Sequence, residues 1–246
     1  MFSPLFEETS KALSSEALLP RFDRGHVPAA RARLARTQDL RELFAPTQLA
    51  ALFREKHELP WLSGDITQDR TPELRRYVIQ QLGVAEVTPE TIVPRLDKPF
   101  LKAQPDAWIV GLYHFLNGQP ALRWRLADLP LVRLEDGSHV EPRVNGQPQA
   151  FLPGTIATGF PTVRASVCAT DTAREFLRSL GLTEPDPVDD VNRNVLPKYR
   201  GNKVHVSDAN YEADIRRILT AFATDSKAQR DKLITALRET AFVMAV

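Results

Sequence analysis

The sequence has little cysteine: Cys168 is the only one in 246 residues. One thiol cannot form an internal disulfide, and it cannot supply a cysteine-based zinc site. The first residues, MFSPLFEETSKAL, carry acidic side chains where a secretion signal has an apolar core. Both features favour a reducing compartment, and we expect a cytoplasmic protein.

Long hydrophobic runs and an excess of charge of one sign are also lacking. No stretch reaches the ~18 consecutive apolar residues of a membrane span, so no membrane partner is predicted. The formal net charge is +1, which gives no global field to recruit nucleic acid or an anionic surface. With 43% hydrophobic and 26% charged residues, the chain has the composition of a globular protein with a sizeable core.

Residues 129–153 predict a small β-meander. An apolar run at 131–134 precedes Gly137, which can take a positive φ at low cost, and His139-Val140 then begins a return strand. Asn145-Gly146 marks a second turn, and residues 150–152 predict a third strand.

The same pattern occurs near the start of the chain, with a small change in length. The matched segments are residues 19–20 with 129–130, Gly25 with Gly137, and residues 26–27 with 139–140. A helix that ends at Leu82-Gly83 has a counterpart that ends at Leu180-Gly181. These matches predict imperfect tandem units, although their spacing varies.

Helical periodicity and helix-start residues predict the remaining elements. The expected helices cover residues 4–17, 37–44, 46–56, 71–82, 106–116, 171–180, 211–223 and 226–237, with Asp106 and Ser226 as caps.

Together these patterns predict an α+β fold, in which short antiparallel hairpins and meanders are flanked by amphipathic helices in imperfect tandem units. The expected division is residues 1–97, then 98–200 with the meander, then 201–246 as the helical start of a further unit. Residues 239–246 match the apolar strand at 128–132, so we expect the chain to be a segment of a longer protein.

No catalytic motif is present: the sequence lacks a P-loop, a dinucleotide-binding glycine pattern, an H-E-x-x-H pair and a nucleophile elbow. Catalytic, cofactor-binding and metal-binding residues are therefore predicted to be none. His26 and His139 both follow a turn and precede Val, which suggests either an enzyme site or a tolerated strand start. The acids Asp186, Asp189 and Asp190 lack the pattern of a calcium loop, which favours a solvated loop that caps the next element.

An arginine-rich stretch at residues 21–41 suggests contact with nucleic acid through Arg24, Arg31, Arg33 and Arg36. Interspersed acids and the lack of interleaved aromatic residues favour instead a solvated helix face. Hydrophobic surroundings predict a buried, unreactive Cys168 and three core tryptophans, which are Trp61, Trp108 and Trp124.

The sequence resembles the region downstream of the ATPase in large bacterial proteins related to sacsin. The resembling segments are residues 18–29, 106–116 (DAWIVGLYHFL), 129–153, 160–182 and 188–199 (VDDVNRNVLPKY). The resemblance implies a parent protein with an upstream GHKL-type (Bergerat-fold) ATP-binding domain, whose own motifs are not in this chain. It implies no cofactor for this segment.

We therefore expect a non-catalytic structural or interaction segment of a multidomain ATP-binding protein. Its expected partners are the rest of the parent polypeptide and a protein whose identity the sequence does not give. The alternatives are a nucleic-acid-contacting module that uses the arginines of residues 21–41 and an enzyme with an unfamiliar His/Asp site.

Overall fold

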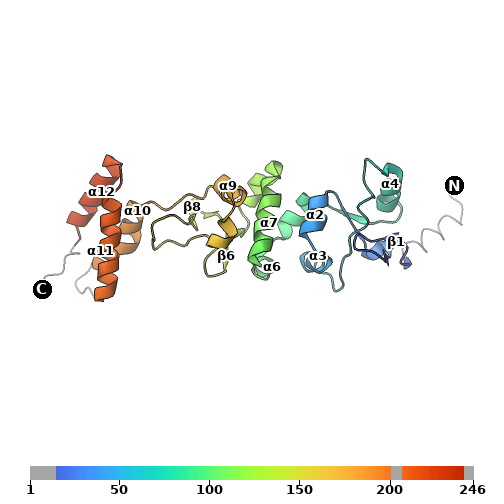
Figure 1. Ribbon diagram of the computed structural model, residues 1–246, viewed down its shortest axis with the longest axis horizontal. Coiled ribbons are helices and arrows are strands. Elements are labelled where there is room, and N and C mark those ends of the chain that lie inside the picture. The colour runs from blue at the N-terminus through green and yellow to red at the C-terminus, as the bar shows by residue number, and fades with distance from the viewer. Residues whose placement is uncertain (1–14, 201–206, 241–246) are drawn as a thin grey trace. The chain divides into compact units, whose positions relative to one another are not determined.

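A computed structural model of the chain describes residues 15–200 and 207–240. In these residues, small two-stranded sheets alternate with helices, which confirms the predicted α+β class (Figure 1). The predicted helix at residues 4–17 and the predicted strand at 239–246 lie largely outside the described residues. Among the helices that are described, none is long and apolar enough to cross a bilayer.

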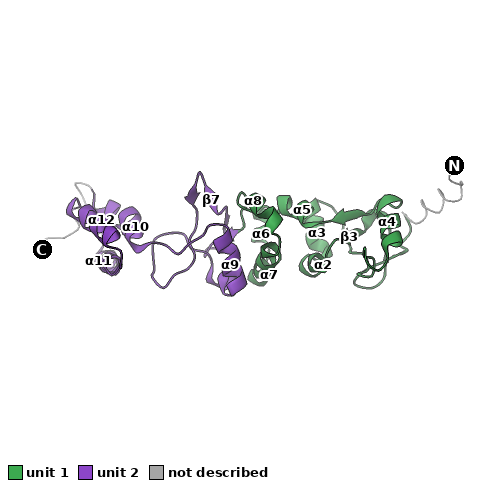
Figure 2. Ribbon diagram, turned by 90° about the horizontal axis from the view of Figure 1, so that it is seen from above, with its two compact units in different colours: residues 1–131 green, residues 132–246 purple. Residues whose placement is uncertain are grey.

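The chain divides into two compact units, residues 1–131 and residues 132–246 (Figure 2). The predicted ranges 1–97, 98–200 and 201–246 group the elements differently. Residues 98–131 belong with the first unit, and the second hairpin opens the second unit.

The first unit combines two small strand pairs with short helices. Its elements are β1 (Leu19–Pro20), β2 (His26–Val27), η1 (Ala29–Arg31), β3 (Arg33–Ala35), α2 (Gln38–Leu43), α3 (Pro46–Phe53), α4 (Pro72–Gln80), β4 (Ala85–Val87), α5 (Pro89–Ile92), η2 (Val93–Arg95), α6 (Lys98–Lys102), α7 (Asp106–Asn117), η3 (Pro120–Leu122) and α8 (Arg123–Leu126). The predicted helices at 37–44, 46–56, 71–82 and 106–116 are confirmed as α2, α3, α4 and α7. Asp106 is the first helical residue, and Pro105 holds the cap position predicted for Asp106.

The second unit begins with two hairpins and ends with long helices. Its elements are β5 (Val132–Arg133), β6 (His139–Val140), β7 (Arg143–Val144), β8 (Gln147–Pro148), η4 (Ala165–Cys168), α9 (Asp171–Ser179), α10 (Pro187–Asp190), the π-helix η5 (Val191–Val195), η6 (Leu196–Tyr199), α11 (Asp208–Phe222) and α12 (Lys227–Arg238). Figure 1 shows α10, α11 and α12 packed together. Ser226 caps α12 as predicted, because its hydroxyl accepts a hydrogen bond from the Gln229 N–H at 3.4 Å.

The repeated hairpin is confirmed, with a corrected alignment. Leu19 pairs with Val27 in the first hairpin and Val132 pairs with Val140 in the second, so Leu19 corresponds to Val132 rather than to Leu129. The loops, residues 21–25 and 134–138, are equal in length, and no length change is needed. Arg24 (φ 74°) therefore occupies the loop position of Gly137 (φ 82°).

The similarity of the two units extends beyond the hairpins. In the first unit, residues 61–62 lie between the hairpin and β3, and in the second unit residues 162–163 lie between the hairpin and Phe151. A helix ending near a positive-φ glycine follows in each unit, Gly83 after α4 and Gly181 after α9. The chain then returns to the same neighbour: β4 pairs with β3 in parallel, and the Leu152 N–H donates to the Thr183 carbonyl at 2.9 Å.

The two units differ in one insertion, and two strand contacts differ from the prediction. The first unit has α2 and α3 between β3 and Trp61, where the second unit has the short segment 153–161. The predicted three-stranded meander is also wrong in one respect, because Phe151 bridges Thr162 and does not continue from β6. The parallel β3–β4 pair was not predicted, since its strands lie about fifty residues apart in the sequence.

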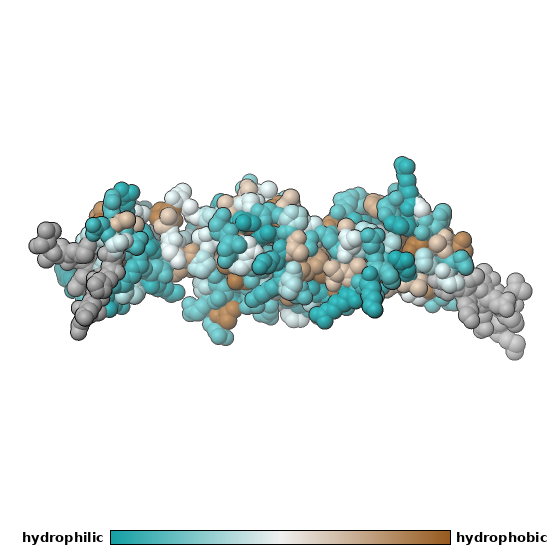
Figure 3. All heavy atoms as spheres, turned by 90° about the horizontal axis from the view of Figure 1, so that it is seen from below, coloured by the Kyte–Doolittle hydropathy of each residue, from teal (hydrophilic) through white to brown (hydrophobic). Residues whose placement is uncertain are grey.

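Each unit buries its own apolar side chains. One core cluster of the first unit includes Leu34, Leu62 and Val78, and one of the second unit includes Val195 and Leu233. The face drawn in Figure 3 is largely hydrophilic, and hydrophobic residues form small patches on it.

The predictions for single core residues are confirmed with one exception. Cys168 and Trp61 are buried, and Trp108 is half-buried. Trp124 is 69% exposed, so the prediction of core packing was wrong for this residue. The guanidinium of Arg125 lies 4.7 Å from the centre of its ring, a cation–π distance.

Candidate functional site

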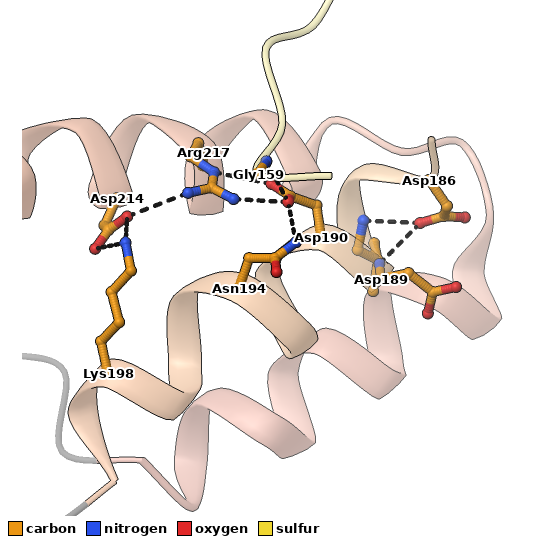
Figure 4. A network of polar contacts seen from close by, with 9 residues as sticks. Gly159, Asp186, Asp189, Asp190, Asn194, Lys198, Asp214 and Arg217 are labelled. Carbon is orange, nitrogen blue, oxygen red and sulfur yellow. Dashed lines mark hydrogen bonds and ion pairs between the residues drawn. The ribbon is translucent and has the colours of Figure 1, made fainter. Parts of the chain in front are cut away.

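Two buried carboxylates and the cations that pair with them lie in the second unit, where α10, η6 and α11 meet (Figure 4). Local sequence explains how α10 begins there. Asp186 is the N-cap, and its carboxylate accepts hydrogen bonds from the N–H groups of Val188 (2.7 Å) and Asp189 (3.1 Å). Pro187 occupies the first helical position, where its missing N–H costs nothing. Asp190 is the last residue of α10, and it is buried.

Asp190 is 1% exposed, and both of its carboxylate oxygens are hydrogen-bonded. Arg217 of α11 binds it with two nitrogens, Nε to Oδ2 at 2.8 Å and Nη2 to Oδ1 at 2.6 Å. Asn194 Nδ2 and the backbone N–H of Gly159 donate to the same Oδ1 at 2.9 Å and 2.8 Å. A two-point guanidinium contact of this kind is strong and directional.

Asp214 is the second buried carboxylate, 2% exposed, and it shares the Arg217 guanidinium at 3.5 Å. Lys198 Nζ donates to both of its oxygens, at 2.8 and 2.9 Å, and the Tyr199 hydroxyl donates to Oδ2 at 2.9 Å. Burial, and then the hydrogen bond to the Asp214 carboxylate, raise the pKa of Tyr199 well above its ordinary value. Tyr199 therefore serves as a neutral donor.

We call the five side chains of Asp190, Asn194, Lys198, Asp214 and Arg217 the buried charge network, after its two buried carboxylates; the Lys198 side chain is 41% exposed. Two carboxylates face two cations, and every carboxylate oxygen has a donor. A general acid or base needs an oxygen that can reach a substrate, whereas these oxygens are all engaged by the protein. The network instead links α10, η5, η6 and α11 to the loop at residue 159.

The predicted acidic cluster separates into three structural roles. Asp186 caps α10 as predicted and also accepts from Gln229 at 3.2 Å, while Asp189 pairs with Lys232 of α12 at 3.0 Å. The prediction of a solvated loop was wrong for Asp190, which is buried. In residues 15–200 and 207–240, no group of three potential ligands is placed to hold a metal ion.

The predicted histidine pair is explained by the repeat. His26 and His139 each begin the return strand of their own hairpin, one in each unit. His26 is exposed and His139 is 5% exposed, so the two equivalent positions differ in burial.

The structure gives the four predicted arginines different surroundings. Arg24 lies in the β1–β2 turn and Arg31 ends η1, and both are exposed. The Arg33 side chain is 14% exposed, and its Nη1 donates to the Ala32 carbonyl at 2.9 Å. Burial lowers the pKa of Arg33. Arg36 lines a groove beside α4.

The sequence alone singled out Asp190 of this network, but not Asn194, Lys198, Asp214 and Arg217. A signal was present for the last two, because they lie three residues apart on a helix and can therefore share a face. Asp214 also lies on the packed side of α11, next to Ile215 and near Ile218, where an acid is out of place unless a cation meets it.

Comparison of the chain with protein-family models, with characterised proteins and with solved structures yields no match.

Proposed function

We propose that the chain is a non-catalytic structural or interaction segment, built from two copies of one hairpin-and-helix module. The observation that carries this proposal is the repeat of the same strand pairing and element order in both units. Repeated modules with their own cores are typical of proteins that present extended binding surfaces. The buried charge network supports the same proposal, because its carboxylates and cations bond one another and so hold the helices together.

The resemblance to sacsin-like proteins extends the proposal to the parent protein. There, an upstream GHKL-type domain binds ATP, and this segment holds or connects its partners in the cytoplasm. The gene tests this part directly: an open reading frame that links these residues to an upstream ATPase supports it, and a free-standing gene contradicts it.

Nucleotide binding tests the non-catalytic role of the segment itself. Isothermal titration of the purified chain with Mg-ATP is expected to give no heat of binding, and incubation is expected to release no phosphate. Saturable binding of ATP, or its hydrolysis, would overturn the proposal.

The second candidate is a nucleic-acid-contacting module, which the exposure of Arg24, Arg31 and Arg36 favours. It predicts binding to single- or double-stranded DNA or RNA at low salt, with a steep loss of affinity as salt rises. Fluorescence anisotropy measures this, and Arg31→Ala with Arg36→Ala should abolish it. Absence of binding at low salt eliminates this candidate.

A further inference from the structure

Two neighbouring recesses in the first unit share one side chain, Arg41 of α2. The first recess is a groove of about 650 Å³ between the end of β3, α2 and α4, and four arginines line it. These arginines are Arg36, Arg41, Arg75 and Arg76. The second recess, of about 410 Å³, is lined by aromatic and apolar residues that include Phe22, Trp61 and Trp108. Both volumes lie in the range of ligand sites.

Arg41 is fixed in position yet lacks an acceptor. Its guanidinium carbon lies 5.5 Å from the centre of the Phe22 ring, and Nη2 is 3.3 Å from the point where a Cβ on Gly64 would be. The Nε atom is buried and has no hydrogen-bond partner among the described residues. The guanidinium also lines both recesses, and no acceptor among the described residues engages its terminal nitrogens, so a ligand oxygen in either recess can accept from them.

The arginines of the groove differ in how far the protein already satisfies them. Arg75 pairs with Glu86, and Arg76 pairs with Glu73 at 3.0 Å. Among the described residues, the Arg36 side chain has no hydrogen bond and no ion pair within 4 Å. Its electrostatic partner is Glu90, whose pKa is lowered chiefly by hydrogen bonds and in part by the charge of Arg36. Arg36 and Arg41 are thus the two cations of the groove that are open to an incoming anion.

The lining decides what kind of anion fits. Asp69 and Glu86 also line the groove, and Asp23 and Glu42 line the aromatic recess. A polyanion such as a nucleic acid strand would bring closely spaced charges against these carboxylates. A peptide with one or two acidic side chains and an apolar anchor meets both surfaces without that repulsion.

We propose that the two recesses bind an extended segment of a partner protein in which an acidic residue lies within a few residues of an aromatic or large aliphatic residue. The acidic side chain bonds Arg36 and Arg41, and the apolar side chain enters the recess beside Trp108. The inference rests on the proposed interaction role and names its partner class. The recesses are also particular to the first unit, because α2 lines both and α3 lines the second, whereas the described segment 153–161 takes the place of these helices in the second unit.

Selection from a phage-displayed library of random dodecapeptides on the full chain tests the proposal. The expected result is enrichment of peptides that combine Glu or Asp with Phe, Trp, Leu or Met. The best selected peptide, labelled with fluorescein, should bind Arg41→Gln about tenfold or more weakly, since a hydrogen bond to a charged group is lost. Arg70→Gln is the matched control, because Arg70 is 74% exposed in the same unit and lies outside both recesses.

Phe22→Ser provides a second variant from the aromatic recess, at a residue that is 50% exposed. It should weaken the same peptide while thermal melting by circular dichroism stays near that of the parent chain. The proposal is overturned if selected peptides lack acidic residues, if no peptide is enriched, or if Arg41→Gln binds as tightly as Arg70→Gln. Tighter binding of oligothymidylate than of the peptide would also overturn it. None of these outcomes bears on the absence of ATP binding, which tests the proposed function separately.

Discussion

Replacing Arg217 by Met should reveal how much the buried charge network stabilises the second unit. The change removes both guanidinium contacts to Asp190 and leaves its buried carboxylate with two donors, the Asn194 amide and the Gly159 N–H. Removal of one partner from a buried ion pair costs about 3–5 kcal/mol. The Arg217 side chain is 20% exposed. We therefore expect Arg217→Met to lower the free energy of unfolding by about 3 kcal/mol, near the lower end of that range.

Arg216→Met is the matched control on the same helix. Arg216 pairs with Glu212 at 2.6 Å, but its side chain is 76% exposed, and pairs of this kind contribute about 0–1 kcal/mol. The double variant Asp190→Leu with Arg217→Met removes both charges and should recover more than half of the loss. The first unit supports this expectation. Its helix α5 and the helix α10 each begin with a proline six residues after the positive-φ glycine, so Ile92 holds the position equivalent to Asp190, and Ile92 is fully buried.

Guanidinium chloride denaturation followed by two probes measures these effects. All three tryptophans lie in the first unit, so their emission reports that unit, while far-ultraviolet circular dichroism also reports the helices of the second. The loss should appear in the dichroism, and amide hydrogen exchange should accelerate in α11. A loss below about 1 kcal/mol, or a double variant no more stable than the single one, would refute the assigned role of the network.

Further changes test other contacts of the second unit. Gly159→Ala would place a Cβ 2.9 Å from a guanidinium nitrogen and should cost about 1–3 kcal/mol in chemical denaturation, whereas Gly154→Ala, whose nearest neighbour is 3.5 Å away, should cost little. The raised pKa of Tyr199 keeps it protonated in the folded state, so stability should fall as pH rises above the ordinary value of 10.0, and less so in Tyr199→Phe. Burial raises the pKa of Cys168, which is 1% exposed, so native protein should react with Ellman's reagent far more slowly than unfolded protein. Gly137→Arg puts a side chain at φ 82° and should lower the unfolding free energy by about 1 kcal/mol while still folding, because the first hairpin holds arginine at the same loop position.

Local signals in the sequence predicted most of the helices and the hairpins. Caps, prolines at first turns and glycines at helix ends act within a few residues, so α4, α7, α9 and α12 began and ended close to their expected positions. The predicted alignment of the two hairpins was wrong by a few residues, because it matched the turn glycines Gly25 and Gly137 with each other. A turn glycine is an incomplete guide when arginine can hold the same positive φ, as Arg24 does.

Long-range contacts account for what the sequence did not predict. The β3–β4 pair and the bridge from Phe151 to Thr162 depend on where a helix returns the chain, which no local pattern encodes. The buried charge network depends in the same way on Asp190 and Arg217, which lie on helices separated by η5 and η6. Arg41 ends the arginine-rich stretch 21–41, but the sequence does not distinguish it from the other arginines, because its lack of an acceptor is a property of packing.

The repeat offers a way to separate residues that fold the module from residues with another role. Some contacts are the same in both units. The hairpin loop, for example, is closed by the N–H of Arg21 in one unit and of Leu134 in the other, and folding alone explains such a shared contact. Where the two units differ, either a different set of side chains fills the same place in the core or the difference serves a function. Asp190 and Ile92 are a case of the first kind, since both side chains are buried, one as a hydrogen-bonded carboxylate and the other as an apolar side chain. The α2–α3 segment is of the second kind, because it leaves the Arg41 guanidinium with an unmet donor between two recesses.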